Sequence, residues 1–100
     1  MEINKSVDKD VLVIVIKGRL DTNTAPELEK SALEDLANYK KLNLDLAALD
    51  YISSAGLRVI LTLHKQMHGK GGALVVLHPK DEVMEVFDMT GFSSFLTIEE

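Results

Sequence analysis

The sequence predicts a small α/β protein with a mixed, mostly parallel sheet and helices packed on one side of it. Apolar, strand-like runs alternate along the chain with segments whose apolar residues recur at helical spacing. The predicted order is ββαβαβαβ, and its three strand–helix–strand units imply right-handed parallel crossovers. The chain has 100 residues and no linker-like stretch, so residues 1–100 are expected to form one domain.

The chain begins with a predicted hairpin. Residues 2–7 alternate apolar with polar side chains, which predicts a short strand with one wet face. A turn is expected over 8–10. Residues 11–16 are continuously apolar and mostly β-branched, typical of a central strand covered on both faces. The first strand should then be an antiparallel edge.

A loop over 18–23 leads to the first predicted helix. Thr24 and Glu27 have the spacing of a capping box, and the apolar positions that follow recur at helical spacing over about 25–38. The next strand, 42–46, alternates leucine with polar residues. One face of the sheet is therefore expected to be less covered than the other.

The second half repeats the alternation of helix and strand. Ser54 is the predicted N-cap of a helix over about 55–68, with Gly69 as the residue just beyond its end. A buried strand is expected over 73–77. A third helix should run from Pro79 to Gly91, and residues 95–98 suggest a short last strand.

Composition excludes several classes of function. The formal net charge of −5 argues against nucleic acid as a partner, because phosphate contacts need a basic patch. The absence of cysteine excludes disulfides, thiolate zinc sites and thiol catalysis. The longest apolar run is far shorter than the roughly 20 residues of a membrane span. The residues after Met1 do not resemble a signal peptide, so a cytoplasmic protein without cofactor or membrane insertion is expected.

The loops after the parallel strands are the expected site, because ligands and partners of open parallel sheets usually meet the carboxyl ends of the strands. These loops would gather a set of polar residues at one end: Arg19, Asp21, Asp50, Ser53, Ser54 and Lys80. A helix N-terminus favours negative charge, so a phosphate on Ser54 would be compatible with the fold. The alternative is that Ser54 is only a cap and Ser53 only a turn residue.

The segment Ile52–Leu57, preceded by the 42–46 strand and by Gly18–Asp21, resembles the STAS domain, the fold of bacterial anti-sigma factor antagonists. The resemblance covers essentially the whole chain. It implies that Ser54 is phosphorylated by an anti-sigma factor with serine kinase activity, which itself binds ATP. It also implies that Asp21 matches the loop aspartate of the family. Many antagonists carry Asp where this sequence has Ser53.

The resemblance implies release of a sigma factor when the unphosphorylated chain binds its partner. The residues expected to touch that partner are Asp21, Ser53, Ser54, Ala55, Gly56, Arg58 and Met84. Met84 falls off the apolar face of its helix, so an exposed side chain is expected. Gly56 is expected to let the partner approach closely, in which case its replacement by Ala would leave stability intact.

Other interpretations remain open. The chain could be a STAS subunit of a lipid transport complex or of a sensory complex, without phosphorylation. A hydrolase triad of Ser54, His78 and Asp21 can be written, but the Gly-x-Ser-x-Gly elbow is missing. His64 and His68 have a spacing that can hold a metal. Acidic residues are absent between Arg58 and Gly72, so a partly buried His64 and a surface His68 are expected instead.

Overall fold

The strands and helices follow the expected order in a computed structural model that describes residues 1–100. The elements are β1 (Glu2–Asp8), β2 (Val11–Leu20), α1 (Ala25–Leu36), β3 (Lys41–Ile52), α2 (Ser54–Gly69), β4 (Ala73–Leu77), α3 (Asp81–Thr90), a 3₁₀ turn (Phe92–Ser94) and β5 (Thr97–Glu99). The predicted order ββαβαβαβ is confirmed. None of the helices is long and apolar enough to cross a membrane.

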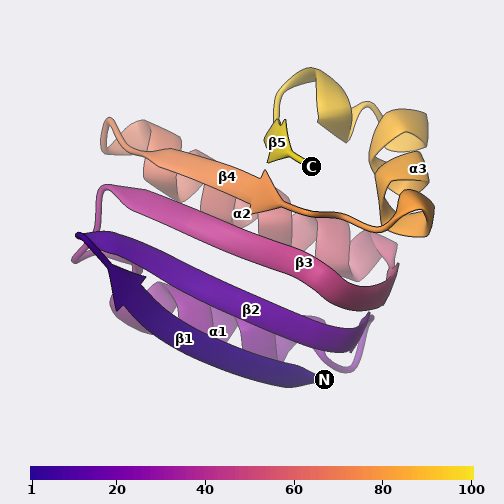
Figure 1. Ribbon diagram of the computed structural model, residues 1–100, viewed down its shortest axis with the longest axis horizontal. Helices are drawn as coiled ribbons and strands as arrows, with labels where there is room; N and C mark the ends of the chain where they lie inside the picture. The colour runs from indigo at the N-terminus through magenta and orange to yellow at the C-terminus, as the bar shows by residue number, and fades with distance from the viewer.

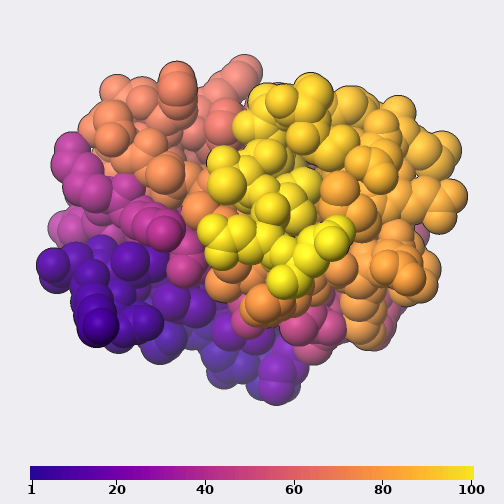
Figure 2. All heavy atoms as spheres, turned by 45° about the horizontal axis from the view of Figure 1, so that its top comes forward, coloured from indigo at the N-terminus to yellow at the C-terminus, as the bar shows by residue number.

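The five strands form one mixed sheet whose spatial order, β1-β2-β3-β4-β5, is the order along the chain. β1 pairs with β2 antiparallel and lies at one edge, as predicted, while β3, β4 and β5 each join the preceding strand in parallel. Helices α1 and α2 cover the same face of the sheet, and α3 lies beyond the carboxyl end of β4 (Figure 1). The C-terminal residues form a continuous surface with α3 (Figure 2).

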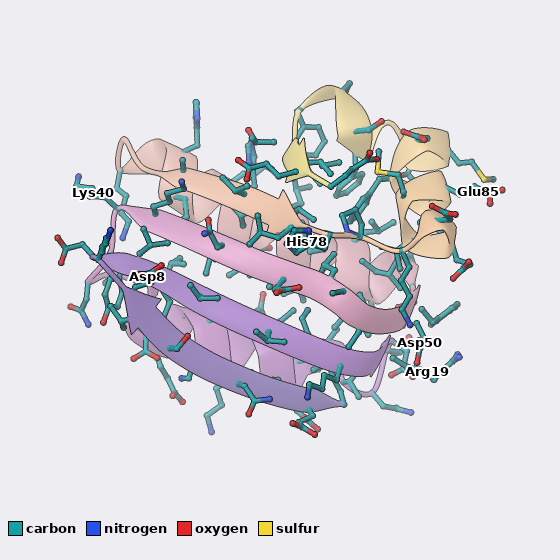
Figure 3. The ribbon with its side chains drawn as sticks, in the orientation of Figure 1. Asp8, Arg19, Lys40, Asp50, His78 and Glu85 are labelled. Atoms are coloured by element: carbon teal, nitrogen blue, oxygen red, sulfur yellow. The ribbon has the colours of Figure 1, made fainter.

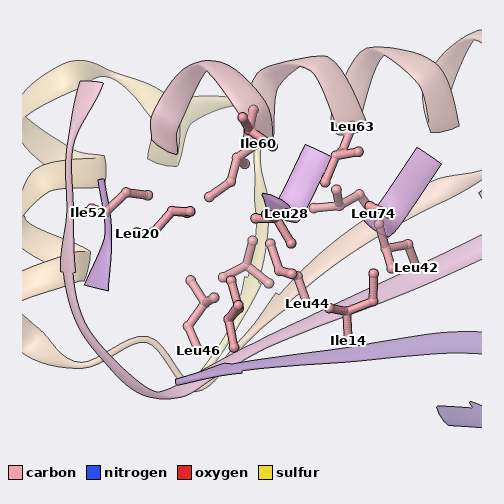
Figure 4. Packing of buried hydrophobic residues seen from close by; sticks show 14 of the residues in the cluster. Ile14, Leu20, Leu28, Leu42, Leu44, Leu46, Ile52, Ile60, Leu63 and Leu74 are labelled. Atoms are coloured by element: carbon pink, nitrogen blue, oxygen red, sulfur yellow. The ribbon is translucent and has the colours of Figure 1, made fainter. Parts of the chain in front are cut away.

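The core lies between the sheet and its helices, and α3 adds Val83 and Phe87 to it. Leucine and isoleucine side chains from β2, β3 and β4 meet Leu28 of α1 and Ile60 and Leu63 of α2 (Figure 4). Every residue that is buried outright is apolar. This one-sided core stabilises the sheet and fixes which of its faces is open.

The open face of the sheet corrects one prediction. In β2, Leu12, Ile14 and Ile16 are buried, but the three valines that alternate with them, beginning at Val11, are only half-buried and no helix covers them. The prediction that this strand is covered on both faces is therefore wrong, because α1 and α2 lie on the same face of the sheet. Asn43 and Asp45 lie on the open face of β3, which confirms that this face is less covered.

β2 and β3 also run further than predicted. Both continue past the expected ends at residues 16 and 46, so much of the sequence expected as loops is strand. The extensions bury Leu20, Leu49 and Ile52 against the helices. The pairing of the two strands shifts register twice on the way, and Gly18 takes the positive φ of 99° that such an irregularity favours.

The predicted capping box before α1 does not form. The Thr24 hydroxyl donates to the Arg19 carbonyl (2.8 Å) and accepts from the Asp21 N–H (2.9 Å), so it does not cap the helix. Helix ends also differ by a few residues from expectation. α1 stops at Leu36, and α3 begins at Asp81, after Pro79, and ends before Gly91.

Candidate functional site

The candidate site lies where β2 and β3 end side by side. Arg19 pairs in register with Tyr51, and Leu20 pairs with Ile52. The N–H of Ser53 then donates to the Leu20 carbonyl at 2.9 Å, which places the start of α2 beside the end of β2. Arg19 and Asp50 lie at this end of the sheet, far from Asp8 and Lys40 at the other (Figure 3).

The two serines at the start of α2 have different roles. Ser53 is the N-cap, with an extended backbone and a side-chain oxygen that accepts from the Gly56 N–H at 3.3 Å. Ser54 is the first residue of the helix, is exposed, and its hydroxyl makes no hydrogen bond. The prediction that Ser54 caps the helix is therefore wrong. Because Ser53 supplies the cap, the exposed Ser54 hydroxyl can be modified without disturbing it.

Asp21 organises the turn that leads into α1. Its Oδ1 accepts from the N–H groups of Asn23 (3.0 Å) and Thr24 (3.1 Å), while Oδ2 lies 3.9 Å from Arg19 Nε. Partial burial raises the pKa of the Asp21 carboxyl, but these hydrogen bonds and the Arg19 guanidinium together lower the pKa below its usual value. The charged form of the Asp21 carboxyl therefore stabilises this turn, and its Oδ2 faces Arg19.

Tyr51 is a site feature that the sequence analysis missed. The Arg19 guanidinium carbon lies 4.1 Å from the centre of the Tyr51 ring, and both side chains are exposed. Such a cation–π contact at an exposed position is worth about 0.5–1 kcal/mol. The contact depends on the register of two strand ends, and neither strand was expected to reach so far. No local motif in the sequence signals it.

An ion pair connects β3 to the turn before α3. Lys80 Nζ contacts Asp50 Oδ1, and the Lys80 carbonyl accepts from the Met84 N–H at 2.8 Å. Met84 itself is half-buried and packs against the core, so the prediction of an exposed Met84 is corrected. Its neighbour Met89 is instead the exposed methionine of this helix.

The remaining predicted contact residues lie on the first turns of α2. Ala55 is half-buried and Arg58 is exposed, one helical turn after Ser54. Gly56 is buried, and a Cβ placed on it would lie 2.7 Å from Leu20 Cγ and 2.9 Å from Ile52 Cγ1. Close packing onto the strand ends is therefore enough to explain this glycine, and the space around it argues against the expectation that Ala would leave stability intact. Contact of Gly56 with a partner stays a prediction.

The structure also places the residues of the alternative sites. No hydrogen bond joins Ser54, His78 and Asp21, and the backbone N–H of His78 donates to Glu99. His64 is half-buried against Phe95 and His68 is exposed, as expected, with the two imidazole rings stacked at 5.9 Å. No group of three potential metal-ligating side chains comes together anywhere in the chain.

The chain is thus a small α/β domain in which an accessible serine is the first residue of the helix that follows the central strand. Comparison with known proteins identifies the family: the model of the STAS domain matches residues 2–100, and the chain belongs to that family. BtrV of Bordetella bronchiseptica, named as a candidate anti-sigma factor antagonist, is 37% identical over 89 residues, covering 88% of this chain and 77% of BtrV. The anti-sigma-B factor antagonist of Listeria monocytogenes is 31% identical over 97 residues, covering 95% of this chain and 84% of that protein.

Solved structures show the same fold. A candidate anti-sigma factor antagonist from Thermotoga maritima superposes with a TM-score of 0.93 at 22% identity, covering 98% of this chain and 86% of that one. SpoIIAA of Bacillus, solved in its phosphorylated form, gives a TM-score of 0.77 at 16% identity, covering 97% of this chain and 90% of its own. The β-sheet order and the one-sided helical layer are therefore those of this family.

Proposed function

We propose that this chain is a bacterial, cytoplasmic anti-sigma factor antagonist, which binds an anti-sigma factor and so releases a sigma factor. The relatives from Bordetella and Listeria, which align with most of the chain, are named for that role. The observation that carries the proposal is the exposed, unbonded hydroxyl of Ser54 at the start of α2. It is the accessible group that a regulatory modification needs.

The partner is proposed to be a serine kinase that binds ATP and phosphorylates Ser54. The Ser54 oxygen attacks the γ-phosphorus, an O–P bond forms, and the bond to the bridging oxygen breaks to release ADP. The hydroxyl proton passes to a base on the partner. SpoIIAA, which has the same fold, has been solved in a phosphorylated form, and this supports a phosphorylated state here.

The local structure is suited to a phosphate at Ser54. The phosphate adds about −1.5 to −2 charges at neutral pH, next to the partial positive charge of the helix N-terminus. Because Ser53 supplies the capping oxygen, the helix keeps its cap in both states. The modification then changes the charge of the contact surface and leaves the fold intact. Repulsion and desolvation of the new anion end the binding of the partner.

The test identifies the acceptor in the natural pair. The tagged chain is purified from its host, the co-purifying kinase is isolated, and the two are incubated with radiolabelled ATP. Label is expected on wild type and on Ser53→Ala, and none on Ser54→Ala. Peptide mapping that places the phosphate on Ser53, or the absence of label on wild type, would contradict the proposal. Recovery of transporter or sensory subunits without a kinase would favour another assembly.

A further inference from the structure

Arg58 is the cation of the site that has no partner. Arg19 lies against Tyr51 and Asp21, and Lys80 pairs with Asp50, so the other basic groups near the strand ends are engaged. The guanidinium of Arg58 makes neither a hydrogen bond nor an ion pair, and the side-chain hydrogen bond at this residue is the one that its backbone carbonyl accepts from the Thr62 hydroxyl. Arg58 occupies an exposed position of α2, so its side chain is accessible to solvent.

The helix offers Arg58 no carboxylate to pair with. Side chains three and four positions away are the neighbours of a helical residue, with Cβ atoms about 5–6 Å apart. For Arg58 these neighbours are Ser54, Ala55, Leu61 and Thr62, none of them acidic. Ser54 is the one neighbour that phosphorylation would convert to an anion.

We propose that Arg58 forms an ion pair with the phosphate carried by Ser54, an inference that rests on the proposed phosphorylation. The anion stands four residues before the cation, the more favourable of the two orientations for such a pair on a helix. The planar guanidinium fork matches two phosphate oxygens, so the contact is bidentate. Phosphorylation thereby changes two surface groups together: it adds an anion at Ser54 and occupies the guanidinium that the unphosphorylated chain presents.

The test uses phosphoserine built into position 54 during translation, so it does not depend on any kinase. The second pKa of the phosphate is measured by ³¹P NMR titration at low salt in otherwise wild-type protein and in Arg58→Gln. Loss of the guanidinium is expected to raise that pKa by about 0.3. Arg58→Lys, which keeps the charge but not the fork, is expected to fall between the two.

Lys65→Gln is the matched control. Lys65 is exposed on the same helix, and its replacement removes the same charge, but it lies about 16 Å along the axis from Ser54. In the Lys65→Gln protein, the second pKa of the phosphate on position 54 is expected to equal that of wild type. In 1 M salt, where the Debye length is about 3 Å, the effect of Arg58→Gln should shrink markedly.

Direct observation of the side chain completes the test. Arg19 and Arg58 are the only arginines of the chain, so their Nε–H signals are easily assigned. Phosphorylation should shift the Arg58 signal and leave that of Arg19 in place. Equal phosphate pKa values in wild type and Arg58→Gln, or an equal rise in Lys65→Gln, would overturn the ion pair. Neither result bears on whether the kinase acts on Ser54, which the labelling experiment decides independently.

Discussion

Ser53 and Ser54 are chemically identical neighbours that the backbone assigns to different tasks. The Ser53 N–H is held by the Leu20 carbonyl, and its hydroxyl accepts from the Gly56 N–H. Ser54 follows inside the helix, with its hydroxyl in solvent. Asp would serve equally well at the first of these positions, because it is as good an N-cap as Ser.

Replacing each serine separates capping from modification. Ser53→Ala should lower the free energy of unfolding by about 1 kcal/mol, because an orphan helix N–H loses its acceptor, and Ser53→Asp should restore most of it. Ser54→Ala should change that free energy by less than about 0.5 kcal/mol, as is usual for exposed positions. Urea unfolding measures all three. A larger loss in Ser54→Ala than in Ser53→Ala would contradict the assignment of the cap.

Position 56 requires glycine because it packs closely against Leu20 of β2, a strand far away in the sequence. Gly56→Ala should destabilise the fold by about 1–3 kcal/mol, because the new methyl group overlaps Leu20 and Ile52. Gly69→Ala is the matched control in the same helix. A Cβ there meets nothing within 4 Å, so helix propensity should make that variant neutral or up to about 1 kcal/mol more stable. Equal unfolding midpoints for the two variants would refute the packing role.

Because of Asp21, the free energy of unfolding is expected to depend on pH in the acidic range. Its pKa is lower in the folded chain than the value of about 3.9 in an unfolded one. The stabilisation is therefore complete above about pH 4 and is lost as the pH falls through the folded pKa. In Asp21→Asn, the free energy of unfolding should be lower near neutral pH and should fall less steeply below pH 4. Identical slopes for variant and wild type, from urea titrations across this range, would exclude this role.

At the scale of the element, the start of α2 is tolerant of negative charge. Its first turn has no acidic residue, so Ser54→Asp should raise the unfolding free energy by up to about 1 kcal/mol or leave it unchanged. The same charge should weaken binding of the partner, measured by calorimetry. Ser54→Asn, nearly the same shape without the charge, should bind more tightly than Ser54→Asp. Equal affinities of the two variants would argue against an electrostatic switch.

Element order, the edge strand and the open sheet face could be predicted because each rests on a local pattern of apolar and polar residues. The extensions of β2 and β3 could not, since the irregular pairing around Gly18 hides their alternation. The cap was misplaced because two serines stand in succession, and only the extended backbone of Ser53, with its hydroxyl accepting from the Gly56 N–H, decides between them. The packing of Gly56 depends on Leu20, 36 positions earlier, which no local pattern reveals.

Across the whole molecule, the helical layer, the uncovered face of the sheet and the candidate site occupy three different regions. The helices cover one face of the sheet, the half-buried valines of β2 lie on the other, and the candidate site occupies one end. The site is framed by strand ends and a helix start that are joined by backbone hydrogen bonds. These bonds restrict movement of the backbone, so the phosphorylation proposed at Ser54 is expected to act by changing charge more than by changing shape.

The sequential order of the strands also governs how the chain reaches its native state. Each strand pairs with the one made just before it: Leu12 with Leu42, 30 positions on, and Leu42 with Leu74, 32 positions on. No pairing has to wait for a distant segment, and loop closure of this length is entropically modest. Every native strand pair therefore joins segments that are adjacent along the chain, and such low sequence separation between contacts favours faster folding than a sheet whose neighbouring strands are distant in sequence.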